Sequence, residues 1–147
     1  MTGAFEGDLV RPLGLVTLFS AYAEGEIDEM LVALCGEQFD HKIQTWTIGR
    51  KLALVQRRVR ALKVESLNGL MTVLKDARKL FELRNEIIHG RLYSGGRLVS
   101  NRRSVPERLV SPEELTDLAE RILSCKEHIC MYRQRHLPAV IAAIGGT

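Results

Sequence analysis

The chain has 147 residues, 46% of them hydrophobic and 27% charged, which is ordinary for a soluble globular protein with one domain over residues 1–147. Residues 1–40 hold eight acids and one base, whereas residues 41–147 hold twenty bases and ten acids. This uneven charge distribution is compatible with binding of a polyanionic partner by the basic part, and equally with ion pairs between acidic and basic helices of one fold. The three cysteines, Cys35, Cys125 and Cys130, are an odd number without framework spacing. They argue against a disulfide scaffold and predict reduced thiols in a cytoplasmic protein.

The first predicted helix covers roughly residues 8–34, with Asp8 as a candidate N-cap. It contains the apolar run PLGLVTLFSAYA. A signal peptide would carry bases before such a run, but here Glu6 and Asp8 outnumber Arg11. The run is also too short to span a bilayer, and Pro12 and Gly14 interrupt it. We therefore expect a core helix of a cytoplasmic protein with no membrane partner, bent or broken where Pro12 or the AEGE stretch falls.

The second and third predicted helices cover about residues 47–62 and 66–89. The second carries Arg50, Arg57 and Arg60 opposite its apolar face. The third ends at Gly90, the residue type preferred just past a helix C-terminus. The apolar face of the second helix is formed by Ile48, Leu52, Val55, Val59 and Leu62.

The fourth predicted helix begins after Ser111, an N-cap in the sequence SPEE, and continues to about residue 135. Pro138 then kinks it or starts a short fifth helix. Before it lies the irregular region 91–109, where RLYSGGRLV predicts a small hairpin around two glycines. The sequence therefore predicts an all-α fold. We expect an up-and-down four-helix bundle, with a short fifth helix and a small basic loop or hairpin between helices three and four.

Three polar residues interrupt the apolar pattern at the end of the third helix. On a helical wheel, Arg84 falls inside the apolar arc, and Asn85 and His89 lie at its edge one turn apart. Arginine is rarely buried without a partner, so an acid of another helix, a second subunit or a phosphate must receive Arg84. Asp28 or Glu29 of the first helix would give a plain structural ion pair. The centre of the arc is formed by Leu70, Leu74, Ala77, Phe81 and Ile88.

The stretch RNEIIHG resembles the Arg-x4–6-His signature, with Asn or Asp after the arginine, of the HEPN superfamily (higher eukaryotes and prokaryotes nucleotide-binding domains). Arg84, Asn85 and His89 stand at the motif positions. HEPN domains are four- or five-helix bundles with this motif late in the third long helix, as predicted here across nearly the whole chain. One subgroup, the toxins paired with a nucleotidyltransferase antitoxin, often continues His-x-Tyr. This chain instead has Arg91 at that place and Tyr93 two residues later.

The resemblance implies a metal-independent endoribonuclease that needs no cofactor and works as a homodimer, with the two motifs facing each other across a cleft. Arg84, Asn85 and His89 would be its catalytic residues. Histidine suits proton transfer near neutral pH, and arginine offers a permanent charge to a phosphate. A role as a toxin or phage-defence effector, with an antitoxin or regulatory protein as partner, is also open. The five arginines of residues 91–108 face a single acid, and we expect RNA binding from Arg91, Arg97, Arg102 and Arg103.

Two alternatives accompany this expectation. A non-catalytic HEPN-type module would use the same bundle as a scaffold that binds a nucleotide, RNA or a protein. Separately, Cys125, His128, Cys130 and His136 are residue types that bind metals, but only Cys125 and His128 share a helical face. Structural zinc sites require two clean pairs, so we expect buried thiols here and no metal.

Overall fold

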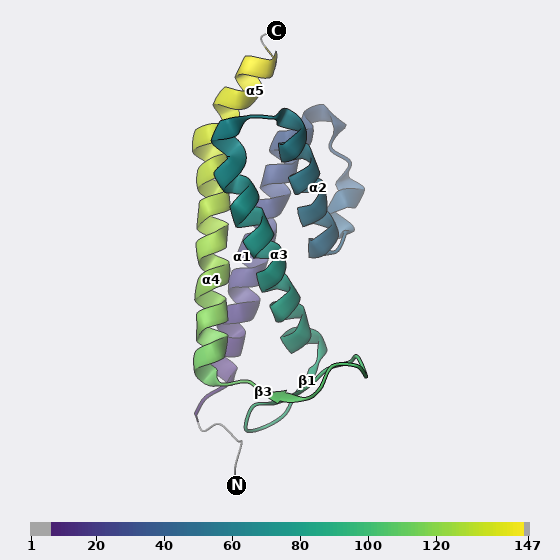
Figure 1. The fold of residues 1–147 in the computed structure, drawn as a ribbon, viewed down its shortest axis with the longest axis vertical. Coiled ribbons are helices and arrows are strands. Elements are labelled where there is room, and N and C mark those ends of the chain that lie inside the picture. The colour runs from purple at the N-terminus through teal and green to yellow at the C-terminus, as the bar shows by residue number, and fades with distance from the viewer. Residues whose placement is uncertain (1–6, 146–147) are drawn as a thin grey trace.

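The structure is a computed structural model that describes residues 7–145. Four helices form its framework and a short fifth continues beyond the fourth (Figure 1), which confirms the predicted all-α bundle. A π-helical turn, Tyr132–His136, joins α4 to α5. The helices are α1 (Val10–Cys35), α2 (Ile48–Leu62), α3 (Asn68–His89), α4 (Pro112–Met131) and α5 (Leu137–Gly145). A small antiparallel sheet between α3 and α4 contains β1 (Arg91–Leu92), β2 (Arg97–Val99) and β3 (Arg108–Leu109).

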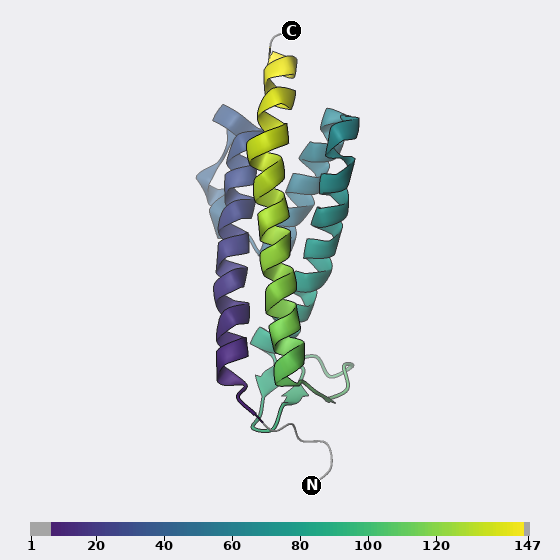
Figure 2. The same cartoon turned by 90° about the vertical axis from the view of Figure 1, so that its left-hand side faces the viewer.

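The helices do not alternate strictly in direction. α1 and α4 lie side by side and run the same way (Figure 2), while α3 runs opposite to both (Figure 1). α2 also runs the same way as α1 (Figure 1): it begins near the middle of α1, where Lys51 lies beside Glu24 and Asp28, and ends where α3 begins. The cause is the connection of residues 36–47, whose two 3₁₀ turns carry the chain partway back before α2 begins. The chain order departs from a strict up-and-down bundle at this connection.

Short polar side chains accept hydrogen bonds from first-turn backbone amides of three helices: Asp8 at α1, Thr47 at α2 and Ser111 at α4. Asp8 Oδ1 accepts a hydrogen bond from the Val10 amide at 2.9 Å, so Asp8 caps α1 from one residue before its N-cap position. Ser111 Oγ accepts from the Glu114 amide at 3.0 Å, as its sequence pattern predicts. α1 is continuous through Pro12, because a proline in the first turn of a helix removes no intrahelical hydrogen bond.

One core joins all four long helices, and it leaves the C-terminal end of α3 partly uncovered. The predicted apolar face of α3 is buried from Leu70 through Phe81, but Ile88 is 37% exposed. α2 has 15 residues and α3 has 22, and Figure 1 shows α3 extending past the start of α2. The last two turns of α3 therefore lack the contact with α2 that covers the same face of α3 nearer its start (Figure 1). The fully buried core includes Ile27, Leu31, Leu52, Leu70, Leu74, Leu115 and Ile122.

Candidate active site at the end of α3

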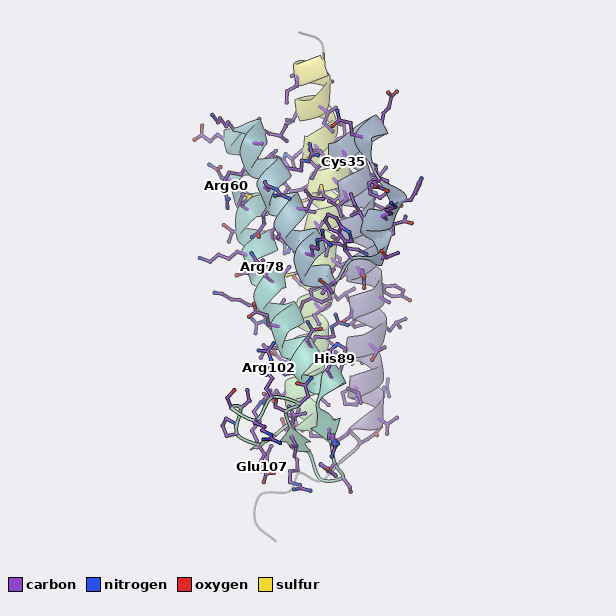
Figure 3. All side chains as sticks on the ribbon, turned by 90° about the vertical axis from the view of Figure 1, so that its right-hand side faces the viewer. Cys35, Arg60, Arg78, His89, Arg102 and Glu107 are labelled. Carbon is purple, nitrogen blue, oxygen red and sulfur yellow. The ribbon has the colours of Figure 1, made fainter. Side chains whose placement is uncertain are left out.

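The motif residues lie in these last two turns of α3. Arg84 and Asn85 are partly buried, and His89, the final residue of the helix, is exposed (Figure 3). Arg84 and His89 are five residues apart, which separates them by about 140° around the helix axis. Asn85 and His89 are four residues apart and lie on the same side. Within one chain, His89 therefore lies on the same side of α3 as Asn85, and Arg84 lies on a different side.

Asn85 and His89 line a hollow of about 490 Å³, which we call the His89 hollow. Glu82 and Glu86 of α3 also line it. Its other wall is the segment between β2 and β3, which contributes Ser100, Asn101, Arg102 and Val105. The structure therefore brings together residues from α3 and from a loop more than ten positions further along the chain.

The small sheet holds this loop against the end of α3. β2 pairs with β1 and with β3, and Leu98 in β2 is buried. Gly90 lies where the chain leaves α3, and a Cβ there would come within 2.9 Å of Leu98 Cδ1 and 3.0 Å of Val99 O. The backbone of Gly90 is extended (φ −81°, ψ 179°) rather than left-handed, which differs from the helix-stop role predicted from the sequence. Glycine is needed here because β2 packs too closely on the helix end for a side chain.

The His89 hollow has mixed charge. Glu82 and Glu86 oppose Arg102 and the titratable His89 within the same lining. Glu86 is only loosely engaged, since its Oε2 lies 3.9 Å from the nearest guanidinium nitrogen of Arg108. This mixed lining therefore gives the hollow little electrostatic attraction for a polyanion.

Arg84 and Asn85 carry buried polar atoms that no neighbour satisfies. Arg84 Nε and Asn85 Oδ1 have no hydrogen-bond partner within residues 7–145. The Arg84 guanidinium lies 5.1 Å from the centre of the Phe81 ring. Burial lowers the pKa of this guanidinium, and the negative charge of Glu24 on α1 only partly opposes the effect. An unsatisfied buried donor and acceptor on adjacent residues cost free energy, which a ligand or a second chain would recover.

The structural ion pair considered for Arg84 does not form. Asp28 instead lies 2.9 Å from Nζ of Lys51, whose ammonium is also 3.1 Å from Glu24. Lys51 is 1% exposed. Burial lowers the pKa of Lys51, but the two carboxylates outweigh this effect and raise the pKa above its usual value. Sequence analysis missed this cluster. The available signal was a lysine among the apolar positions of α2 and two acids one turn apart on α1.

The four arginines predicted to bind RNA differ in their surroundings. Only Arg102 lines the His89 hollow, where its backbone amide donates to Ser100 Oγ at 3.1 Å. Arg97 stacks on Tyr93 at 4.3 Å and pairs with Glu107 at 3.4 Å. Arg91 and Arg103 are exposed. Of these four arginines, only Arg102 therefore lies at the hollow that contains His89.

Two further features bear on the class of protein. Within residues 7–145, no three side chains of histidine, cysteine, aspartate or glutamate gather as a metal site would require. Cys35, Cys125 and Cys130 are free thiols, and burial followed by the charge of Asp76 raises the pKa of Cys125. Across the same residues, the helices are too short or too polar to traverse a lipid bilayer.

Comparisons of this chain with protein-family models, with curated proteins and with solved structures found no match.

Proposed function

We propose that this protein is a metal-independent endoribonuclease of the HEPN type that acts as a homodimer. The observation that carries the proposal is the placement of His89 and Asn85 on one open hollow, next to an Arg84 whose buried Nε has no partner within residues 7–145. These are the residue types that metal-free RNA cleavage requires: a group that titrates near neutrality and a permanent cation.

The reaction would use the 2′-hydroxyl of RNA as its nucleophile. His89 would take the proton of this hydroxyl as its oxygen attacks the adjacent phosphorus, or donate a proton to the departing 5′-oxygen. The P–O5′ bond then breaks, leaving a 2′,3′-cyclic phosphate on one product and a 5′-hydroxyl on the other. Asn85, one turn before His89 on the same side, can orient the imidazole or the phosphate through its amide.

A second copy of the chain would complete the site. A single histidine cannot easily act as base and acid in one step, and Arg84 points about 140° away from His89 around α3. Two-fold pairing at the end of α3 would bring both missing groups to the cleft. Large apolar side chains are exposed at this end of the bundle, as a dimer interface there requires: Leu83, Ile88, Tyr93 and Leu109 are 37–39% exposed.

The test is cleavage of a single-stranded RNA oligonucleotide in EDTA. We expect His89→Ala to slow the chemical step by about 100- to 10,000-fold, the usual contribution of acid–base catalysis. His128→Ala is the matched control, since His128 is exposed on α4. Arg84→Ala should also abolish most activity, whereas Arg121→Ala, an exposed arginine on α4, should not. Equal activity of the His89 and His128 variants would refute the proposal.

The separation of Arg84 from His89 within one chain supports a second candidate, a non-catalytic module that binds RNA, a nucleotide or a protein. A strictly monomeric chain at micromolar concentration would favour this candidate, because the catalytic groups would never meet. Sedimentation velocity together with the cleavage assay separates the two: a dimer that cuts RNA supports the enzyme, and a monomer that binds without cutting supports the module.

A further inference from the structure

A second hollow, of about 500 Å³, lies between α2 and α3, away from the motif. We call it the arginine hollow. No acidic residue lines it, and its four arginines form no ion pair within the described part of the chain. Its polar and aromatic lining consists of Trp46, Arg50, Gln56, Arg57, Arg60 and Arg78.

Two of the four cations are held in place by neighbours that do not neutralise them. The Arg50 guanidinium lies 3.6 Å from the centre of the Trp46 ring. Arg78 Nη1 donates to Gln56 Oε1 at 3.0 Å, which ties α3 to α2 across the hollow. Cation–π stacking and a neutral hydrogen bond orient a guanidinium while leaving its charge available. Arg57 and Arg60 are exposed beside them.

The arginine hollow and the His89 hollow lie along the same side of α3 (Figure 3). Arg78 and His89 are eleven residues apart on α3, which places them almost in line around the helix and about 16 Å apart along it. Figure 3 shows Arg60, Arg78 and Arg102 in succession along this side. A distance of 16 Å corresponds to about five nucleotides at the ~3.4 Å spacing of a stacked strand.

The two hollows have complementary properties. The lining of the His89 hollow sets two carboxylates, Glu82 and Glu86, against one permanent cation, Arg102, so this lining alone does not attract a polyanion. The arginine hollow has the unbalanced positive charge that phosphate binding requires. It also lacks what a protein partner would need: none of the exposed large apolar side chains among residues 7–145 lies on α2.

We propose that the arginine hollow binds the phosphate backbone of a single-stranded RNA whose other part occupies the His89 hollow. Arg57 and Arg60 neutralise successive phosphates, Arg78 contacts the strand as it passes to α3, and the Trp46 ring holds the Arg50 guanidinium in place beside them. The part of this proposal that concerns cleavage rests on the proposed function. The binding itself does not.

The binding test uses the full-length His89→Ala protein and a fluorescent 15-nucleotide RNA, with affinity measured by anisotropy across a salt series. Adding Arg57→Ala and Arg60→Ala should weaken binding about tenfold at moderate salt, as expected for two phosphate contacts. It should also reduce the slope of log affinity against log salt by about 1.4. Single-stranded DNA of equal length should compete, because the contacts are to the backbone.

Arg58→Ala is the matched control. Arg58 is exposed on the same helix, next to Arg57, but does not line the arginine hollow. Removing it changes the net charge by the same amount as Arg57→Ala. We expect Arg57→Ala to weaken binding and reduce the salt slope more than Arg58→Ala does. Equal effects of the two variants, or a polyglutamate that competes as well as RNA, would overturn the proposal.

Cleavage assays distinguish failure of this proposal from failure of the proposed function. In the His89-containing protein, Arg57→Ala with Arg60→Ala should raise KM for the 15-nucleotide RNA and leave kcat unchanged. A dinucleotide, too short to reach the arginine hollow, should be cut equally well with and without these changes. RNA that is bound through Arg57 but never cut would refute the ribonuclease and leave the binding site standing. RNA that is cut with no dependence on Arg57 or Arg60 would refute the binding site alone.

Discussion

Gly90 couples the end of α3 to the loop that forms the other wall of the His89 hollow, and Gly90→Ala tests this coupling. Alanine tolerates the extended backbone at this position (φ −81°, ψ 179°), so the substitution introduces no backbone strain. Its Cβ, however, would lie 2.5 Å from Glu86 O, 2.9 Å from Leu98 Cδ1 and 3.0 Å from Val99 O. Val99 O is a backbone atom of β2, so β2 must move away from α3, and the carbonyl of Glu86 in the last turn of α3 must shift as well.

Overpacking of this kind costs about 1–3 kcal/mol. For a chain of this size, a loss of 2 kcal/mol lowers Tm by about 8 °C. Displacement of β2 also carries Ser100 and Arg102 away from His89, so RNA cleavage should fall even below the melting transition. Thermal unfolding followed by circular dichroism measures the first effect, and initial cleavage rates at 20 °C measure the second.

Gly25→Ala provides a control with the opposite expected sign. Gly25 lies inside α1 with open space around its Cβ position. Alanine there should stabilise the protein by about 0.5–1 kcal/mol, because glycine loses more backbone entropy in a helix. If Gly90→Ala matched or exceeded the stability of the unaltered protein, the close approach of β2 to α3 would be wrong.

Two further predictions concern stability. Lys51→Ala would leave Glu24 and Asp28 without their buried cation and should lower the free energy of unfolding in urea by about 3 kcal/mol. Replacing the exposed Lys79 by alanine should change this free energy by less than about 0.5 kcal/mol. Similar small effects of both substitutions would contradict the buried cluster. Ser111→Ala removes the acceptor of the Glu114 amide and should cost about 1 kcal/mol in the same assay, a loss that Ser111→Asp should avoid, since aspartate also caps helices.

Local patterns in the sequence predicted the helices well because each is determined by nearby residues. The apolar repeat of α2 and the Ser111 cap depend only on spacing and on side-chain chemistry, and the structure has both. The hairpin around Gly95 and Gly96 was predictable for the same reason, since both glycines adopt positive φ in its turn. The third strand, Arg108–Leu109, had no such local signal.

Properties that depend on distant neighbours were not predictable. A helical wheel indicates which side of α3 is apolar, but it cannot show that α2 is too short to cover Ile88. It placed Arg84 inside the apolar arc and left Asp28 as one possible partner, but it could not show that Asp28 already pairs with Lys51. The direction of α2 depends on how far the connection of residues 36–47 returns, which its composition does not specify. The joining of His89 with Ser100 and Arg102 required the packing at Gly90.

The most direct test of the central claim is analysis of the RNA ends after incubation in EDTA. Mass spectrometry of the products should detect a 2′,3′-cyclic phosphate, or the monophosphate from its hydrolysis, together with a 5′-hydroxyl. A matching DNA oligonucleotide should remain intact because it lacks the 2′-hydroxyl. Products that carry a 5′-phosphate, cleavage of the DNA, or a strict requirement for magnesium would each contradict the proposed chemistry of Arg84, Asn85 and His89.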